Sequence, residues 1–282
     1  MWRLIAIALF AVATSPSVVA ASPPPQRIVS LNLCIDPIVL ELVPRERIQA
    51  LSLVSADRNV SPIVDQIDGI RLVKGTAEEV LALDPDLVLA GDYTTPATVD
   101  LLRRLGRRVE VIPMAVDMPG VRTTIQAVAR AVGEPDRGAE LIGQFNRKFD
   151  AAQVREPGRR PEAVVYQANS LVSPDGSLAA AALEAAGFTN AANRLQPGAA
   201  GQVSLESLVV RPPDLVALGQ NATTYRTPLA DNLRHPALAY VLSRRPHIDL
   251  PMPLWLCGTQ HLADAVTILA RAREQLIERS RP

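Results

Sequence analysis

The apolar residues of this chain fall into two patterns, short uninterrupted runs and longer stretches in which they recur every three or four positions. Uninterrupted runs are typical of strands covered on both faces, and spaced stretches are typical of helices with one buried side. The runs predict strands at residues 27–31, 48–54, 87–90, 109–112, 163–167, 215–218 and 248–250, with a short strand near Phe188. The spaced stretches predict helices at residues 38–43, 99–105, 121–132, 136–155, 178–186 and 262–278. This alternation indicates an α/β fold with mostly parallel sheets flanked by helices.

One part of the pattern occurs twice without a gap. Glu78 to Gly91 reads EEVLALDPDLVLAG, and Glu206 to Gly219 reads ESLVVRPPDLVALG. Each copy predicts a short helix, a Pro-Asp corner that ends it, and a buried strand. Thr76 and Ser204 precede the two helices, and a side-chain oxygen at either position can cap the free amides of the first turn. The repeat therefore predicts one helix-turn-strand unit in each of two lobes.

The length of the chain also predicts two lobes, because 282 residues exceed what one hydrophobic core usually serves. We expect an N-terminal lobe at residues 22–134, a connecting helix at 135–159 and a C-terminal lobe at 160–282. The helix would be about 30 Å long, enough to run along both lobes and limit hinge motion. Gly138 and Gly143 weaken it and leave its straightness open.

Residues 1–21 have the pattern of a secretory signal peptide. Arg3 precedes an apolar run, and small residues follow it up to Ala20 and Ala21, after either of which cleavage is expected. The run is too short to span a bilayer as a helix, so a retained anchor is the weaker alternative. We therefore expect an exported, periplasmic protein.

The composition and the absence of several sequence motifs argue against several classes of function. The chain has 29 basic and 29 acidic residues, and no basic cluster alternates with aromatic residues, which argues against a nucleic-acid partner. Its three histidines are too scattered for a metal cage, so no resident metal or other cofactor is expected. Neither a nucleophile elbow nor a phosphate-binding or dinucleotide-binding glycine motif occurs in the sequence. We therefore expect a binding protein and not an enzyme.

Four features together carry a resemblance to a known family. They are the opening RIVSL with its strand-to-helix loop, the pattern AEEVLALDPDLVL, its echo in the second half, and Trp255 after the last strand. In these features the chain resembles the substrate-binding proteins of ABC importers for cobalamin, ferric siderophores and haem, over residues 27–278. The resemblance implies two lobes joined by a long helix, with a cobalt- or iron-containing chelate bound between them. It also implies a monomeric periplasmic receptor that delivers the chelate to an ABC permease and ATPase complex.

The ligand within this class stays open. Cobalamin or a ferric siderophore is the first expectation, because no histidine or tyrosine is clearly poised as an axial ligand for haem. A haem receptor is the alternative within the class. A sensor or scaffold receptor that binds the same ligand without transport is the alternative outside it.

The resemblance also implies a role for Glu78 and Glu206. They fall on the family's pair of glutamates, one in each lobe, which engage arginines of the membrane-embedded permease. The residues themselves support an outward position, because each glutamate is the second residue of a capped helix. An alternative needs no partner, since acidic residues in the first turn of a helix are stabilised by the helix dipole.

Candidate ligand-binding residues follow the predicted strands, because ligands of parallel sheets usually lie beyond the carboxyl ends of the strands. These candidates are Asn32, Asp57, Tyr93, Tyr166, Tyr225, Arg226 and Trp255. Trp255 is expected against the ligand, since a flat ring buries a large area beside a macrocycle. The alternative for Trp255 is a place in the core.

Cys34 and Cys257 are the only cysteines, and both are also candidates for the ligand site. Cys34 follows the first predicted strand and Cys257 follows the last. We rank buried and unpaired thiols first, a disulfide second and metal ligation third, because the family's cleft is wide. A disulfide requires α-carbons within roughly 7 Å of each other.

Overall fold

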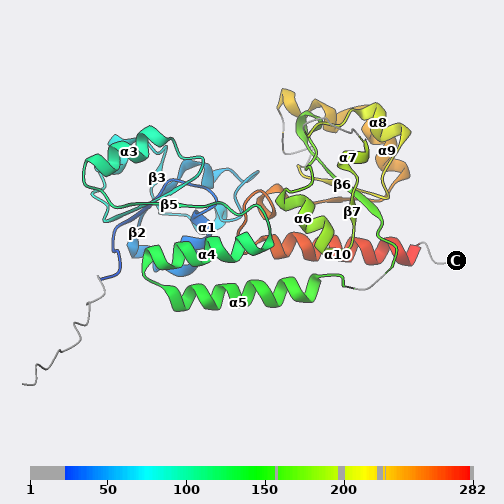
Figure 1. The fold of residues 1–282 in the computed structure, drawn as a ribbon. Helices are drawn as coiled ribbons and strands as arrows, with labels where there is room; N and C mark the ends of the chain where they lie inside the picture. Colours follow the sequence, from blue (N-terminus) through cyan, green and yellow to red (C-terminus); the bar gives the residue numbers. More distant parts are fainter. Residues whose placement is uncertain (1–22, 156–157, 196–200, 221–224, 226, 280–282) are drawn as a thin grey trace, which may run out of the picture.

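The computed structural model describes residues 23–155, 158–195, 201–220, 225 and 227–279. Figure 1 shows two lobes side by side above a layer of helices. The segment predicted to be a signal peptide, residues 1–21, lies outside the described residues. The predicted boundaries of the lobes at residues 134 and 159 stay predictions.

The N-terminal lobe is built on a five-stranded parallel sheet with the order β3-β2-β1-β4-β5. Its strands are β1 (Ile28–Ser30), β2 (Ile48–Ser52), β3 (Leu72–Val73), β4 (Leu87–Gly91) and β5 (Val109–Ile112). Its helices are α1 (Asp36–Leu42), α2 (Ala77–Leu81), α3 (Pro96–Arg104) and α4 (Met118–Val132). The sequence pattern did not predict β3, because two residues are too few to form a recognisable run.

The C-terminal lobe has a four-stranded parallel sheet with the order β7-β6-β8-β9. Its strands are β6 (Glu162–Tyr166), β7 (Thr189–Asn190), β8 (Leu215–Leu218) and β9 (His247–Asp249). Its helices are α6 (Leu178–Ala185), α7 (Ala192–Leu195), α8 (Leu205–Val210), α9 (Pro236–Arg244) and α10 (Leu262–Arg279). The short α7 and α9 were not predicted, and α9 buries only Leu238 and Val241, so its apolar pattern is weak. The α/β class with parallel sheets is confirmed.

The two copies of the repeat form equivalent parts of the two sheets. The pair α2–β4 lies in the first lobe, and α8–β8 lies in the second. In each copy the aspartate of the Pro-Asp corner accepts backbone hydrogen bonds at the start of the neighbouring strand. Asp86 accepts them from Gln26 N at 2.8 Å and Arg27 N at 2.9 Å, whereas Asp214 accepts one from Glu162 N at 2.9 Å. The corner thus fixes where the adjacent strand begins.

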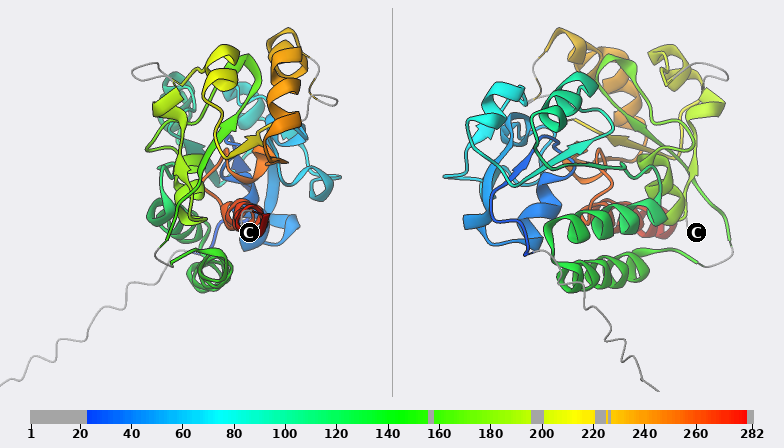
Figure 2. Two further views of the ribbon diagram at one scale, coloured as in Figure 1. Left: turned by 90° about the vertical axis from the view of Figure 1, so that its right-hand side faces the viewer. Right: turned by 60° about the vertical axis from the view of Figure 1, so that its left-hand side comes forward.

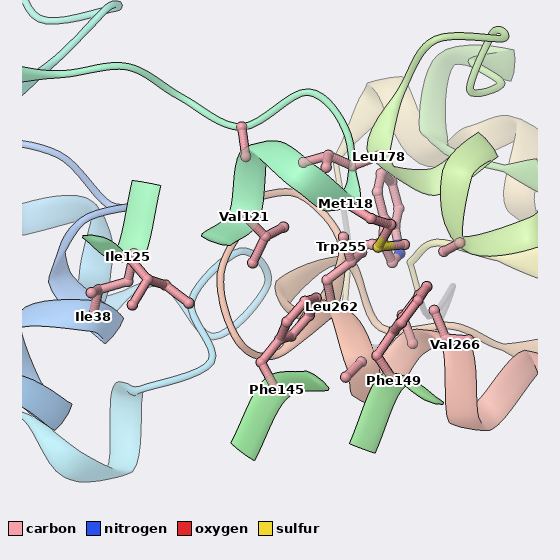
Figure 3. Close-up of a cluster of buried hydrophobic side chains, with 14 of the residues drawn as sticks. Ile38, Met118, Val121, Ile125, Phe145, Phe149, Leu178, Trp255, Leu262 and Val266 are labelled. Atoms are coloured by element: carbon pink, nitrogen blue, oxygen red, sulfur yellow. The ribbon is translucent and has the colours of Figure 1, made fainter. Parts of the chain in front are cut away.

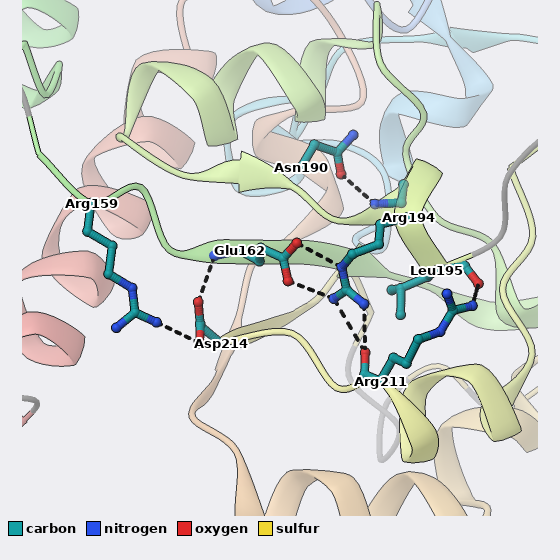
Figure 4. A network of polar contacts seen from close by, with 8 residues as sticks. Arg159, Glu162, Asn190, Arg194, Leu195, Arg211 and Asp214 are labelled. Atoms are coloured by element: carbon teal, nitrogen blue, oxygen red, sulfur yellow. Dashed lines mark hydrogen bonds and ion pairs between the residues drawn. The ribbon is translucent and has the colours of Figure 1, made fainter.

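In the second lobe this corner belongs to a larger polar network (Figure 4). Arg194 Nε donates to Glu162 Oε1 at 2.7 Å, and its guanidinium also reaches the backbone oxygen of Arg211. Arg211 in turn donates to the backbone oxygen of Leu195 at 3.1 Å. The network ties the start of β6 to α7 and to the end of α8.

A layer of long helices joins the lobes. The helix α5 (Pro135–Ala152) runs below α4 and the start of α10, and the end-on view of Figure 2 shows it as a separate layer under α10. The helix is uninterrupted at both of its glycines, and its 18 residues correspond to about 27 Å. A Cβ atom at Gly138 would overlap the side chain of Ala129, so this glycine lets α5 approach α4 closely. Lys148 of α5 also forms an ion pair with Asp264 of α10.

One hydrophobic cluster extends through this layer into both lobes (Figure 3). It includes Phe145 and Phe149 of α5, whose rings are stacked with centroids 5.8 Å apart. Side chains of α4 and α10 pack around the two rings, namely Met118, Val121, Ile125, Leu262 and Val266. Because this core is shared, the base of the molecule does not divide cleanly into two bodies.

Candidate functional site

A pocket of about 230 Å³ lies where the two lobes meet. Its walls come from segments that follow the carboxyl ends of strands β1, β4, β5, β6 and β9, as expected for a ligand site of parallel sheets. It is lined by Cys34, Tyr93, Met114, Ala115, Val116, Ser173, Gly176, Ser177, Leu178, Ala179, Trp255, Leu256, Cys257 and Gly258. None of these lining residues carries a charged side chain, so the pocket favours the neutral part of a ligand.

The wall from the N-terminal lobe is largely apolar and open to solvent. The side chain of Tyr93 is 89% exposed, and that of Val116 is 65% exposed. Their two loops are joined, because Met114 N donates to Asp92 Oδ2 at 2.9 Å. This wall therefore offers a tyrosine and a valine that a ligand could cover without displacing any core packing.

On the opposite wall, Trp255 is held in a fixed orientation. Its Nε1 donates to the backbone oxygen of Leu250 at 3.0 Å, and the side chain is only 6% exposed. A Cβ atom at Gly219 would lie 3.0 Å from the indole ring, so the end of β8 also supports the tryptophan. Trp255 belongs to the core cluster, near Met118 and Leu178 in Figure 3, and it also lines the pocket. The place in the core that was the alternative for Trp255 is therefore confirmed, and its contact with a ligand stays a prediction.

The floor of the pocket contains a disulfide bond between Cys34 and Cys257. Their α-carbons are 5.1 Å apart, within the range that a disulfide allows. The expectation that the cysteines are unpaired is wrong, because the lobes touch at the floor. The segment after Cys257 reaches the N-terminal lobe, where Gln260 Nε2 donates to the backbone oxygen of Pro37 at 3.2 Å.

The remaining candidates lie elsewhere. Tyr166 is fully buried in a second hydrophobic cluster, which belongs to the C-terminal lobe. Its hydroxyl group donates a hydrogen bond to Ser170 Oγ at 3.0 Å. The expectation that Tyr166 faces the cleft is therefore wrong. The reason is that both faces of β6 are covered. Tyr225 also packs on that cluster. Asp57 is exposed and accepts from Asn59 N at 2.9 Å within its own turn. Arg226 lies outside the described residues.

Asn32 supports the pocket without lining it. Its Oδ1 accepts from Cys34 N at 2.8 Å and so shapes the loop that carries this cysteine. A Cβ atom at Gly91 would overlap the Asn32 amide, which explains the glycine at the end of the first repeat copy.

A fully buried carboxyl group lies two residues after Cys34. Asp36 Oδ2 accepts from Ser52 N at 3.0 Å and from Ser55 Oγ at 2.5 Å. Burial raises the pKa of Asp36 to about 7, although these hydrogen bonds partly oppose the shift. The start of α1, two residues after Cys34, therefore contains a carboxyl group whose pKa is well above its usual range.

Sequence reasoning missed the pocket residues that have no distinctive chemistry. Met114, Ala115 and Val116 follow the predicted strand at 109–112, and Ser173 to Ala179 lie in the loop and helix after the strand at 163–167. Their position beyond strand ends was the available signal. No residue type among them would have singled them out.

Glu78 and Glu206 are exposed near the starts of α2 and α8. Both predicted caps are present: Thr76 forms a capping box with Glu79, and Ser204 Oγ accepts from Ser207 N at 3.2 Å. Hydrogen bonds from its own backbone amide and from Ser204 keep the pKa of Glu206 below its usual range. Glu206 is therefore a charged carboxylate at neutral pH.

A second hollow, of about 690 Å³, lies between the end of α5 and α10. Its lining includes Lys148, Arg155, Arg271 and Glu274. Residues 156 and 157, which follow Arg155, are outside the described part of the chain. Because this hollow lies between helices of the helical layer and away from the strand ends, we do not assign the ligand site to it.

Neither metal cages nor membrane helices occur in the described part of the chain. No group of three or more His, Cys, Asp or Glu side chains there could hold a metal ion. No helix there is both long and apolar enough to cross a bilayer. His261 is half-buried, with Nδ1 3.9 Å from Asp264 Oδ2, and burial lowers its pKa.

Two α/β lobes joined by long helices, with an uncharged pocket between them, define a two-lobed solute-binding protein. Residues 28–241 match the periplasmic binding protein family. The chain belongs to this family, whose members bind solutes as ligands and are not enzymes. Its members act in the periplasm or elsewhere outside the cytoplasm.

Known proteins resemble this chain in sequence and in structure. A cobalamin-binding protein of Halobacterium salinarum is 27% identical over 202 residues, which are 70% of this chain and 55% of the relative. The chain thus spans only about half of that curated relative's length. Among solved structures, the heme-binding protein RhuT of Roseiflexus sp. RS-1 has a TM-score of 0.73 at 22% identity, covering 89% of this chain and 98% of the other. The vitamin B12-binding protein BtuF of Vibrio cholerae has a TM-score of 0.63 at 17% identity, covering 90% and 99%. These structures share the fold.

Proposed function

We propose that the protein is an exported receptor that binds a metal-chelate nutrient between its lobes and delivers it to an ABC permease. The observation that carries the proposal is the pocket at the strand ends, with an exposed tyrosine on one wall and a fixed tryptophan on the other. Aromatic and apolar walls suit a large, flat ligand. At about 230 Å³ the pocket receives part of such a ligand, and the exposed Tyr93, Val116 and Leu256 extend the surface beyond it.

Cobalamin is the ligand that this pocket supports best. The edge of a corrin ring carries neutral amides, whereas haem carries two carboxylates that usually require cationic partners. Among the residues that the structure describes, no arginine, lysine or histidine lines the pocket. A ferric siderophore with neutral chelating groups remains compatible with the same lining. The relative named as cobalamin-binding supports the first choice, and the solved structure named as heme-binding keeps haem as the alternative.

Absorbance or fluorescence titration of the mature protein tests the ligand. Cyanocobalamin, haemin and a neutral ferric hydroxamate are compared under one set of conditions. We expect cyanocobalamin to bind at least about tenfold more tightly than haemin, a difference of about 1.4 kcal/mol. Tighter binding of haemin would show that the protein is a haem receptor instead. If none of the three compounds binds, the proposal is overturned.

We also propose that Glu78 and Glu206 dock the receptor on its permease. Each is exposed near the start of a capped helix, and the two helices belong to the equivalent units of the two lobes. A permease with two basic patches could therefore contact both lobes at once. The proposal extends to a monomer whose segment 1–21 is removed on export, which the mass of the mature protein would test.

Uptake measurements separate docking from ligand binding. The double variant Glu78→Ala and Glu206→Ala is expected to bind the ligand as the wild type does and to lose uptake by the permease. Glu140 and Glu278, exposed on α5 and α10, are matched controls, because their replacement removes the same charge from the helical layer. Unimpaired uptake by the first double variant would favour a sensor or scaffold receptor instead.

A further inference from the structure

The disulfide bond joins the two lobes directly. Cys34 lies in the loop between β1 and α1, and Cys257 lies after β9, 223 residues later in the chain. Both residues line the pocket between the lobes. Cys34 is half-buried and Cys257 is 3% exposed, so access to the bond is through the pocket at Cys34.

The residues after Cys257 are fitted to the N-terminal lobe. A Cβ atom at Gly258 would overlap the side chain of Ala115 and lie 3.2 Å from its Cα atom, so glycine permits this close approach. Two residues further on, Gln260 donates to the backbone oxygen of Pro37 at 3.2 Å. The segment 257–260 therefore touches the first lobe at three points, of which one is covalent.

This contact is a second line of attachment between the lobes. The first is the helical layer, in which α5 packs on α4 and α10 and Lys148 pairs with Asp264. Attachment along one line leaves a rotation about that line, as in hinged two-lobed proteins. A second line at the pocket floor removes this freedom. It also fixes the separation of Tyr93 and Trp255, which lie on opposite walls.

We propose that the Cys34–Cys257 disulfide is both the floor of the ligand site and the brace that sets the spacing of its walls. The floor role rests on the proposed function, whereas the brace role does not. A ligand bound in the pocket then blocks a reductant from reaching the disulfide. A dithiol such as dithiothreitol supplies the two electrons and two protons of reduction, so the S–S bond breaks, two cysteine thiols form, and the reagent leaves as its cyclic disulfide.

Hydrogen exchange without ligand tests the brace. The oxidised protein is compared with the double variant Cys34→Ser and Cys257→Ser, and with the reduced wild type in case the variant does not fold. We expect exchange at residues 113–116 and 256–261 to become at least about tenfold faster when the bond is absent, while α6 and β6 stay unchanged. Equal exchange in the oxidised and reduced wild type would overturn the brace.

The rate of reduction tests the floor. Dithiothreitol is added to the oxidised protein with and without saturating cyanocobalamin, thiols are counted by alkylation and mass, and the corrin absorbance is followed to show that the ligand stays intact. We expect the bound ligand to slow reduction at least about fivefold, and the unbridged protein to bind it about tenfold more weakly because its walls are no longer preorganised. Binding without any protection would overturn the floor role and leave the proposed function standing. If cyanocobalamin does not bind, haemin or the ferric hydroxamate takes its place in this experiment. Absence of binding by all three would overturn the proposed function and the floor role together, and hydrogen exchange would still decide the brace.

Discussion

The two copies of the repeated unit form the same local structure but have different surroundings. Both begin with a hydroxyl cap, both turn at a Pro-Asp corner, and both end in a glycine beside the pocket region. Gly91 makes room for Asn32 of its own lobe, whereas Gly219 makes room for the indole ring of Trp255. The comparison teaches that the repeat determines the backbone, while the neighbours determine what each copy contributes to the site.

The largest difference that we expect between the lobes is in how pH changes the stability that each contributes, because among the described residues only the first lobe has a buried carboxyl group with a strongly raised pKa. Asp36 is the first residue of α1, the helix after β1, whereas α6, the helix after β6, begins at Leu178, which has no titratable side chain. Burial raises the pKa of Asp36 from 3.8 to about 7, so the folded protein holds this proton more tightly than the unfolded chain does. The stabilisation is therefore complete below about pH 4, is lost as pH rises to about 7, and does not change further above that.

The substitution Asp36→Asn removes the titrating carboxyl group, so it tests whether Asp36 causes this dependence of the unfolding free energy on pH. Between pH 4.5 and 8 the wild type should lose about 3 kcal/mol more unfolding free energy than the variant, because each pKa unit corresponds to about 1.4 kcal/mol. Urea unfolding at both pH values measures the difference, and other titrating groups cancel between the two proteins. Parallel pH curves for wild type and variant would contradict the assignment.

The Pro-Asp corners should differ in the stability that they provide. Asp86→Ala removes the acceptor of two backbone amides, and Asp214→Ala removes the acceptor of one. We expect losses of about 2 and about 1 kcal/mol in unfolding free energy, since hydrogen bonds to charged groups are the stronger ones. Denaturant titration of both variants gives the order, and a larger loss for Asp214→Ala would reverse the comparison.

A tyrosine of the pocket wall can be compared with an exposed tyrosine outside the pocket. Tyr93→Ala should weaken binding of cyanocobalamin about tenfold without changing the unfolding free energy, because the side chain is 89% exposed and lines the pocket. Tyr240 of α9 is a matched control, being 48% exposed and not among the pocket residues. Titration of both variants is the measurement, and equal affinities would remove Tyr93 from the site.

The smallest expected difference lies at the helix caps. Thr76→Ala and Ser204→Ala should each cost about 1 kcal/mol. The loss at Thr76 should be slightly larger, because only this cap is reciprocal: the Glu79 carboxylate accepts from Thr76 N at 3.4 Å and from Lys74 N at 2.9 Å. Thermal unfolding of the two variants side by side would show the order.

Much of the fold was accessible from sequence because its signals are local. The run at 109–112 and the strand β5 coincide, as do the run at 215–218 and β8, since uninterrupted apolar residues between turns have few alternatives. The hydroxyl cap at Thr76 also formed as predicted, because it joins residues three apart in the chain. The strand β3 was missed because its two residues are held by pairing with β2 and not by their own pattern.

The candidate site was predicted less completely, because lining a pocket depends on which face of an element is covered. Tyr166 ends the buried strand β6 and Trp255 lies after the edge strand β9, yet the side chain of Tyr166 is in the core while the loop after β9 brings Trp255 to the pocket. Met114 and Val116 line the pocket only because β5 ends beside β4. The sequence pattern predicted that the pocket lies at the carboxyl ends of the strands, but it did not predict which side chains line it.

By itself the sequence determined the repeated helix-turn-strand unit, the caps of its two helices, and a helix α5 long enough to run along both lobes. Those features depend on residues within a few positions of one another. Only the tertiary structure decided that Cys34 and Cys257 are joined, because their pairing depends on how close two lobes approach after the shared core forms beneath them. The separation of the pocket walls is set by that same packing and not by any local pattern.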